Sequence, residues 1–183
     1  MGQKRDAIGI TPTVVAKDAP NLLKGCAFWE VKLLPSIATA IAADRIVELQ
    51  TTEPEEVLAR LVAAIAASAG LADREEALRT AILAREELSS TAIDGGLALP
   101  HARLPGLKAF TIALGRSREG VAFGAQDGRP VHIFLMLAGP EGEERQPDYL
   151  KLLRSATGFL RAEKERLLGL EDLTMAYALC QEY

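Results

Sequence analysis

The chain has 183 residues and is 49% hydrophobic, which supplies enough apolar material for one well-packed core. Its formal net charge is −4, with acidic and basic residues interleaved, and this balance excludes nucleic acid as an expected partner. The most apolar stretch, residues 57–71, is too short to span a bilayer, and no unbroken apolar segment follows Lys4 and Arg5 as it does in a secretion signal. We therefore predict a cytoplasmic protein with no direct membrane insertion.

Residues 1–33 contain scattered glycines and prolines and have no periodic apolar pattern. We interpret them as an extension, which is either a poorly ordered arm or a segment docked on the folded part of the chain. The regular patterns begin after this extension. We therefore place a single domain over residues 34–183.

Apolar periodicity and helix start signals predict the first elements of this domain. A short helical turn is expected over residues 37–43, and the alternating pattern of residues 44–49 predicts a strand. Residues 52–55, Thr-Glu-Pro-Glu, have the pattern of a capping box with proline in the first turn, which predicts a helix that runs to Ala69. A second helix is expected over residues 73–87.

The rest of the domain is expected to contain three strands and two more helices. The apolar run of residues 131–138 is typical of a central strand that is covered on both faces. This order of helices, strands and helices predicts an α/β fold, a single compact domain with helices packed on a mixed sheet. The expected elements are strands at 96–99, 110–116 and 131–138, turns at 118–120 and 126–130, and helices at 147–161 and 170–179.

The cysteines and histidines do not form a pattern typical of a metal site or a disulfide framework. Cys26 and Cys180 lie far apart and outside any CxxC spacing, so we interpret them as two reduced thiols. The two histidines, His101 and His132, come without a close carboxylate pair or a cysteine pair to complete a metal site. We therefore do not expect a metal site, and no glycine-rich nucleotide loop is present either.

His101 is the first candidate for chemistry, because it follows a proline and a double glycine within a short apolar run. Pro100 restricts the backbone at this point, and Gly95–Gly96 permits a tight turn or a close approach. A neutral imidazole is a nucleophile near neutral pH and attacks phosphorus or an acyl centre without a separate base. An attached phosphoryl group needs cations and hydrogen-bond donors, and the nearest cations in sequence are Arg85 and Arg103.

Two further groups of polar residues leave alternatives open. The hydroxyls of Ser89, Ser90 and Thr91 can donate to phosphoryl oxygens, but they can equally cap or turn the chain after the second helix, and this reading is the more common one. His132 lies inside the apolar strand, where a histidine is more often a satisfied core residue than a catalytic one. It can approach His101 only if their strands are neighbours.

Apolar residues surround His101 in the sequence. We expect them to form an apolar rim on which a protein partner docks. They are Leu97, Leu99, Leu104, Leu107 and Phe110.

Residues 85–101 resemble the active-site signature of the IIA component of the bacterial sugar phosphotransferase system (PTS), in its fructose/mannitol class (type 2). This class includes the nitrogen-regulatory IIA proteins. The signature consists of Arg85-Glu86, then Ser90-Thr91, then Gly96-Leu97-Ala98-Leu99-Pro100-His101. Further matching segments follow in the right order at residues 114–117, 120–123, 130–131 and 138–140, so the resemblance covers about residues 33–183.

The resemblance implies a phosphoryl carrier in a phosphoenolpyruvate-dependent system. His101 would accept the group on Nε2 from a histidine-containing phosphocarrier protein, and Arg85 would lie beside the phosphohistidine. The group would pass to a cysteine or histidine of a IIB partner. The implied fold is a mixed sheet of about five strands with helices on both faces, and no cofactor is implied.

One departure from the family pattern concerns Tyr149. Many members carry a second active-site histidine where this chain has Tyr149, which can form a hydrogen bond but cannot exchange a proton with His101 near neutral pH. This departure keeps an alternative open. In this alternative, the chain is a regulatory module of the nitrogen-related system that acts through phosphorylation-dependent protein binding, without sugar transport.

Overall fold

The computed structural model describes residues 35–183. The predicted extension and Cys26 lie outside the described residues. Within residues 35–183, no helix is long and apolar enough to cross a membrane. The elements, in chain order, are α1 (Ile37–Ala40), β1 (Ile41–Glu48), α2 (Pro54–Ser68), η1 (Ala72–Arg74), α3 (Glu75–Leu88), β2 (Ala92–Ile93), β3 (Leu97–Ala98), β4 (His101–Leu104), β5 (Thr111–Val121), β6 (Val131–Pro140), η2 (Glu143–Arg145), α4 (Gln146–Gly169), η3 (Leu173–Met175) and α5 (Ala176–Cys180).

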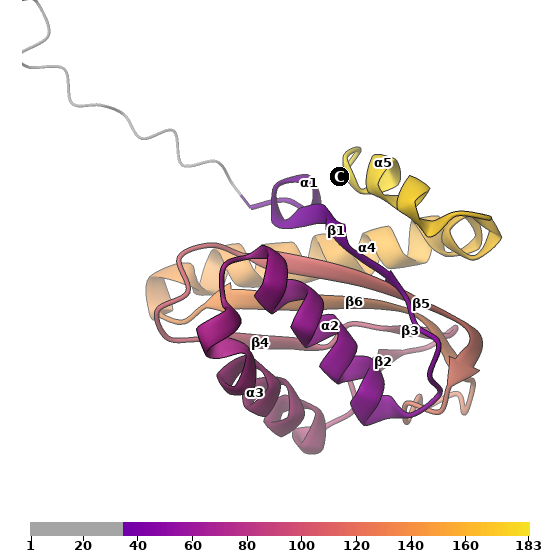
Figure 1. Cartoon of the computed structure of the whole chain (residues 1–183), viewed down its shortest axis with the longest axis horizontal. Coiled ribbons are helices and arrows are strands. Elements are labelled where there is room, and N and C mark those ends of the chain that lie inside the picture. The colour runs from indigo at the N-terminus through magenta and orange to yellow at the C-terminus, as the bar shows by residue number, and fades with distance from the viewer. Residues whose placement is uncertain (1–34) are drawn as a thin grey trace, which may run out of the picture. The chain divides into compact units, whose positions relative to one another are not determined.

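Six strands form one mixed sheet, in the order β1-β5-β6-β3-β2, with β4 also paired to β6 (Figure 1). The central strands β5 and β6 are antiparallel, β1 is parallel to β5, and β3 and β4 are both parallel to β6. The predicted α/β fold with a mixed sheet is confirmed. The strand count exceeds the expected five because β2 and β4 are too short to produce an alternating pattern in the sequence.

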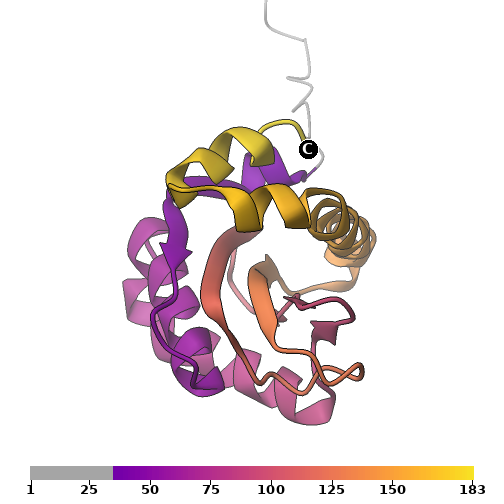
Figure 2. The ribbon, with the colours of Figure 1, turned by 90° about the vertical axis from the view of Figure 1, so that its right-hand side faces the viewer.

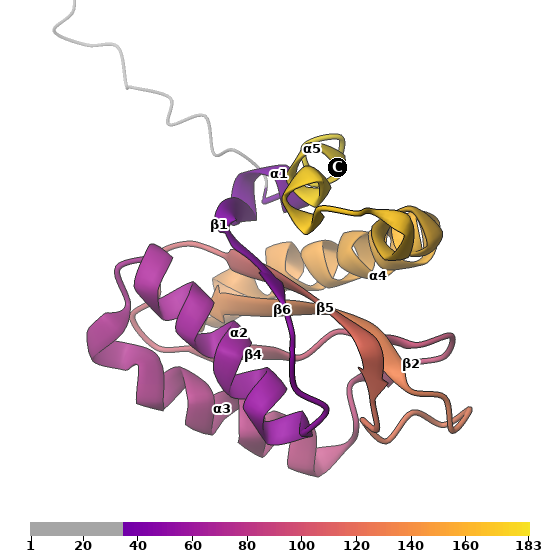
Figure 3. The ribbon, with the colours of Figure 1, turned by 45° about the vertical axis from the view of Figure 1, so that its right-hand side comes forward.

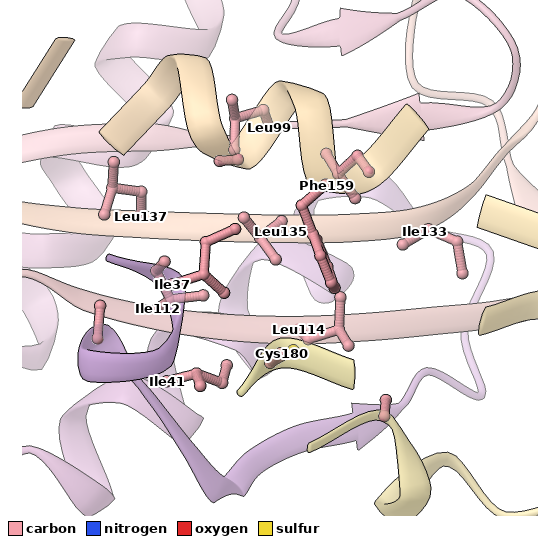
Figure 4. Packing of buried hydrophobic residues seen from close by; sticks show 14 of the residues in the cluster. Ile37, Ile41, Leu99, Ile112, Leu114, Ile133, Leu135, Leu137, Phe159 and Cys180 are labelled. Carbon is pink, nitrogen blue, oxygen red and sulfur yellow. The ribbon is translucent and has the colours of Figure 1, made fainter. Parts of the chain in front are cut away.

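Helices cover both faces of the sheet, as expected (Figures 2 and 3). The apolar run of β6 is explained by this arrangement, because successive side chains of a strand point to opposite faces. Ile133, Leu135 and Leu137 pack under α4, α1 and α5, whereas Phe134, Met136 and Ala138 pack under α2 and α3. Figure 4 shows the first of these cores, which contains Ile133, Leu135, Leu137, Phe159 and the buried free cysteine Cys180.

Helix α2 begins near the predicted position, but the predicted capping box is wrong. Glu53 is the N-cap residue and its side chain makes no capping bond. The hydroxyl of Thr51 accepts a hydrogen bond from the N–H of Glu53 at 3.2 Å and donates to the carboxylate of Glu56 at 2.9 Å. The hydroxyl that stabilises the start of the helix therefore lies one position before Thr52.

The first helical turn and the long hairpin also differ from the predictions. The turn ends at Ala40, and β1 begins at once rather than at residue 44. β5 continues through residues 118–120, where a turn was predicted, and reaches Val121 opposite Val131. The pairing is irregular between Arg116 and Val121, and Gly120 has a φ of +84°, so the strand bends here without ending.

The two C-terminal helices have boundaries that the sequence did not indicate. α4 extends eight residues beyond the predicted end at 161 and reaches Gly169, because Leu167 continues its buried face. The predicted helix at 170–179 is interrupted, and the chain forms the short elements η3 and α5 instead. The side chain of Asp172 accepts a hydrogen bond from the N–H of Thr174 at 2.9 Å and so starts a new turn there.

The fully buried guanidinium of Arg116 joins three elements. It pairs with the carboxylate of Glu48 on β1, with Nε 3.1 Å from Oε1. Its Nη1 donates at 2.7 Å to the carbonyl oxygens of Leu167 and Leu170, at the C-terminal end of α4. These carbonyls have no partner within the helix, so the arginine satisfies them and holds the end of α4 against the sheet.

We predict that Arg116→Met lowers the free energy of unfolding by about 3 kcal/mol, because it leaves buried carbonyls without their donor and leaves Glu48 with only the longer contact to Arg118 at 3.7 Å. Urea denaturation measures the loss. Arg118→Met is the matched control: Arg118 also bonds the carbonyls of Leu170 and Glu171, but its side chain is 59% exposed. Its replacement should cost less than about 1 kcal/mol. Equal losses in the two variants would contradict this account of Arg116.

Candidate active site

His101 is the first residue of β4, and the backbone that presents it is held by β6. The carbonyl of Pro100 accepts a hydrogen bond from the N–H of Leu137 at 2.9 Å, and His101 lies opposite Leu137 in the parallel register. Pro100 has no N–H to donate, so the chain leaves β3 before it and enters β4 after it. The imidazole therefore projects from a well-defined strand end and is partly exposed.

The double glycine makes the turn between β2 and β3. Gly95 and Gly96 have φ values of +91° and +79°, which other residues rarely adopt. A Cβ at Gly96 would lie 3.0 Å from the carbonyl oxygen of Pro130, so the predicted close approach is present. The carboxylate of Asp127 accepts a hydrogen bond from the N–H of Gly95 at 2.8 Å. Sequence reasoning assigned Asp127 only to a turn and missed this contact between the two loops.

The hydrogen bonds of His101 define where its ring proton lies. Nδ1 is 2.7 Å from the carbonyl oxygen of Leu99, and because a carbonyl only accepts, Nδ1 carries the proton. Nε2 is 3.2 Å from Nε of Arg85, which only donates, so Nε2 accepts with its lone pair. The ring is thus in the neutral form, with its proton on Nδ1 and its lone pair on Nε2.

The surroundings of His101 favour the neutral ring. Burial is the main cause that lowers the pKa of His101 below its ordinary value. The nearby Arg85 cation lowers it further, while the Leu99 carbonyl and the Glu86 carboxylate act in the opposite direction. Because the pKa of His101 is lowered, the neutral ring persists to lower pH than it would for a free histidine.

Arg85 comes from the last turn of α3 and is held there by the loop that follows. Its Nη1 donates to the carbonyl oxygen of Ser89 at 2.9 Å, while its Nε points to His101. The guanidinium is therefore oriented at two of its nitrogens. The structure brings together Arg85 and His101, which are 16 positions apart in the sequence.

Tyr149, in the first turn of α4, lies beside the imidazole. The centroids of the His101 and Tyr149 rings are 6.1 Å apart with an interplanar angle of 62°. Phe110 stacks on Tyr149 with ring centroids 6.3 Å apart, and a Cβ at Gly139 would lie 2.8 Å from Phe110 and 3.3 Å from Tyr149, so the glycine leaves room for both rings. Only 7% of Tyr149 is exposed, so its orientation is determined by this packing.

Arg103 adds a second cation to the site. It lies two residues after His101 on β4 and therefore on the same face, with Cζ 5.4 Å from the centroid of the Tyr149 ring. Burial raises the pKa of Tyr149 to about 12, although the Arg103 and Arg85 cations oppose this shift. At physiological pH Tyr149 is therefore neutral, and its hydroxyl can donate a hydrogen bond. The positive charges of Arg103 and Arg85 both act on it.

The three hydroxyls of the loop after α3 do not converge on the imidazole. Ser90 Oγ donates to the carbonyl of Phe123 at 2.8 Å, and Thr91 Oγ1 donates to the carboxylate of Glu86 at 2.5 Å. Ser89 contributes its backbone carbonyl, as the partner of Arg85. For Ser90 and Thr91, the geometry thus favours the alternative in which their hydroxyls stabilise the loop.

The structure does not bring His132 to His101, although β4 and β6 are neighbours. His132 lies five positions along β6 from Leu137, the residue opposite His101, which corresponds to about 16 Å. Its Nδ1 is 3.0 Å from the carbonyl oxygen of Ser117, at the bend of β5. The ring therefore belongs to the far end of the hairpin.

The expected apolar docking rim is wrong, because its five residues are at most 9% exposed and belong to the core. The alternation of side chains along β3 and β4 directs Leu97 and Leu104 into the core. Leu107 and Phe110, in the connection between β4 and β5, are buried as well. Large apolar side chains that are exposed near the site come from other elements. Leu88, at the end of α3 that also carries Arg85, is 83% exposed, and Leu150, next to Tyr149, is 54% exposed.

This arrangement of sheet and helices occurs in solved IIA domains of the phosphotransferase system. The nitrogen-regulatory protein IIA-Ntr from Neisseria meningitidis superposes with a TM-score of 0.71 at 25% identity, over 79% of this chain and 98% of that one. The mannitol IIA protein from Escherichia coli shares the fold with a TM-score of 0.60 at 20% identity, over 76% and 97% of the two chains.

The sequence profile described as "Phosphoenolpyruvate-dependent sugar phosphotransferase system, EIIA 2" matches residues 40–177, and the chain belongs to this family, whose members are phosphotransferase components. The fructose-specific EIIABC component of Bacillus subtilis is 36% identical over 123 residues, which are 67% of this chain and 19% of that protein. This chain thus spans about a fifth of the Bacillus protein. A nitrogen regulatory protein of Bradyrhizobium diazoefficiens is 32% identical over 133 residues, or 72% and 84% of the two chains.

We predict that Arg85→Gln raises the pKa of His101, because it removes a cation that opposes protonation of the ring. An NMR titration of the His101 ring signals between pH 4 and pH 9, roughly the range around the ordinary histidine pKa, measures the change. Arg79→Gln, on the same helix and exposed at its side chain, is the control and should leave the His101 curve in place. An unchanged curve in Arg85→Gln would show that the guanidinium does not face Nε2.

Proposed function

We propose that the chain is a phosphoryl carrier in which Nε2 of His101 accepts a phosphoryl group. The observation that carries this proposal is the pair of ring hydrogen bonds, with Nδ1 donating to Leu99 and Nε2 accepting from Arg85. A neutral ring with its free lone pair directed at a cation is suited to attack on a phosphate and to stabilise the anion that results. Membership in the type 2 IIA family supports the same reading.

The proposed transfer step forms one bond at Nε2 of His101 and breaks one bond in the donor. The Nε2 lone pair of His101 forms a bond to phosphorus while the nitrogen–phosphorus bond of a donor phosphohistidine breaks, and the electrons of that bond return to the donor ring. No proton moves on His101, because Nδ1–H keeps its bond to the Leu99 carbonyl throughout. Arg85 exchanges its hydrogen bond to Nε2 for one to a phosphoryl oxygen, which is a stronger, charge-assisted bond.

Three groups are suited to hold the attached phosphoryl group. Arg85 lies at the nitrogen that becomes phosphorylated, and Arg103 lies on the same strand face two residues from it. Tyr149 packs against both Arg103 and the imidazole and keeps its proton, so it can donate to a phosphoryl oxygen. Two cations and a neutral donor offset the charge of the phosphoryl group without a second titrating ring.

The proposed donor is a histidine-containing phosphocarrier protein, and the proposed acceptor is a IIB component. The mannitol IIA protein of Escherichia coli, which shares this fold at 19% identity, is known in a complex with phosphorylated IIB. In this chain the partly exposed ring and the exposed Leu88 and Leu150 nearby suit a brief contact with a protein. The cytoplasm, where both partners would be found, is the proposed location.

A regulatory role is the second candidate function. It is favoured by the similarity to the Bradyrhizobium and Neisseria nitrogen-regulatory proteins, which extends over 84% and 98% of those chains. In that role the phosphoryl state of His101 would control binding to a target protein. The same chemistry at His101 underlies both roles, and transfer of phosphate from this chain to a IIB component distinguishes them.

We predict that the protein acquires acid-labile phosphate when it is incubated with phosphoenolpyruvate, the upstream kinase and the phosphocarrier protein. His101→Ala should abolish this labelling, because no other nitrogen in the site can accept the group. His132→Ala should retain it, since that ring lies about 16 Å away along β6. Phosphorus NMR of the labelled protein identifies the modified nitrogen as Nε2. Labelling that persists in His101→Ala would refute the proposed site.

We predict that Tyr149→Phe slows phosphorylation about tenfold, the effect of losing one hydrogen bond to a charged group. The aromatic packing against Phe110 is retained in this variant, so its unfolding midpoint should match that of the wild type. Stopped-flow or quench-flow assays with the phosphocarrier measure the rate. A wild-type rate in Tyr149→Phe would exclude the hydroxyl from the phosphoryl site.

A further inference from the structure

Glu86 and Thr91 form a closed contact next to the site, although neither touches the imidazole ring of His101. One carboxylate oxygen of Glu86 accepts from the backbone N–H of Thr91 at 2.8 Å, and the other accepts from its hydroxyl at 2.5 Å. Thr91 is only 6% exposed, so these bonds are shielded from water. Both carboxylate oxygens are thus used on one residue, in a pair that we call the Glu86–Thr91 clasp.

We propose that the Glu86–Thr91 clasp positions Arg85 for the reaction of His101, so that Glu86 and Thr91 are positioning residues. This inference rests on the proposed function of His101. The clasp joins α3 to Thr91 and so closes the loop formed by Ser89 and Ser90. Ser89 provides the carbonyl that holds Nη1 of Arg85. With this carbonyl in place, Nε of Arg85 is directed at Nε2 of His101.

The loop needs such a clasp because little else holds it on the α3 side. Leu88 is 83% exposed and packs against nothing that would restrain the chain there, and Ser89 is exposed as well. The C-cap residue Ser89 has an extended conformation, so the helical bonds have ended before it. The other tethers lie at the end of the loop away from α3: Ser90 Oγ donates to the carbonyl of Phe123, and the N–H of Leu99 donates to the carbonyl of Thr91 at 3.0 Å.

The clasp also determines where the negative charge of Glu86 lies. Adjacent residues of a helix do not face one another, so Glu86 cannot pair directly with Arg85 while both remain on α3. Its carboxylate is committed to two donors of Thr91, which keeps it directed at the loop. The cation of Arg85 is consequently left for His101 and for the anion that His101 would carry.

The test compares Thr91→Val, which removes the hydroxyl but keeps the shape, with Thr91→Ser, which keeps the hydroxyl. In Thr91→Val we expect phosphorylation to slow about tenfold, the effect of one lost hydrogen bond to a charged group. We also expect the pKa of His101 to rise in an NMR titration, because Arg85 no longer opposes protonation. Thr91→Ser should restore both properties. Thr80→Val, an exposed position on α3, should change neither.

A second variant, Glu86→Ala, removes the clasp from its other side. Its effect on the phosphorylation rate should not add to that of Thr91→Val in the double variant, because either change alone opens the loop. This comparison keeps the proposal testable if one of the variants folds poorly.

The titration separates failure of this inference from failure of the proposed function. A wild-type His101 curve in Thr91→Val overturns the positioning role, whatever the rate. A slower rate with an unchanged curve also overturns it, since a merely structural defect would act in that way. If the wild-type protein accepts no phosphate at all, the proposed function fails, while the difference between the two titration curves still decides whether the clasp orients Arg85.

Discussion

The location of one ring proton governs what His101 can do. The Leu99 carbonyl, 2.7 Å from Nδ1, holds the proton on that nitrogen and leaves the lone pair on Nε2. Leu99 and Pro100 separate β3 from β4, which both pair with β6, and Pro100 has no N–H to continue that pairing. The bond is local, but its geometry depends on β6, which fixes the positions of Pro100 and His101.

The site is assembled from three elements with different degrees of support. β4 supplies His101 and Arg103 from the sheet, and α4 supplies Tyr149 from a long helix that is held at its far end by Arg116. α3 supplies Arg85 from its last turn, beside an exposed loop. Arg85, the cation beside Nε2 of His101, thus lies on the least supported of the three elements. The side-chain hydrogen bonds of the loop after α3 compensate for this weak support.

His101 and Arg85 could be predicted from the sequence, whereas the side chains that surround them could not. The proline, the double glycine and the arginine indicated His101 and Arg85 because their backbone requirements and charges are local properties. The apolar rim around His101 was misassigned because apolar residues next to a site are as easily core as surface, and the sheet turned Leu97 and Leu99 inward. The exposure of Leu88 has no signal in the sequence, because a single leucine at a helix end forms no pattern.

The amino-acid sequence alone indicated the family, the α/β class and His101 as the candidate nucleophile, since each depends on short segments whose geometry is set by neighbouring residues. The tertiary structure decided which groups surround that histidine. Tyr149 reaches it from 48 positions away, His132 does not reach it, and the hydroxyl of Thr91 bonds Glu86 rather than facing Nε2. These outcomes depend on strand register and on how helices close over the sheet, which are properties of contacts between distant segments.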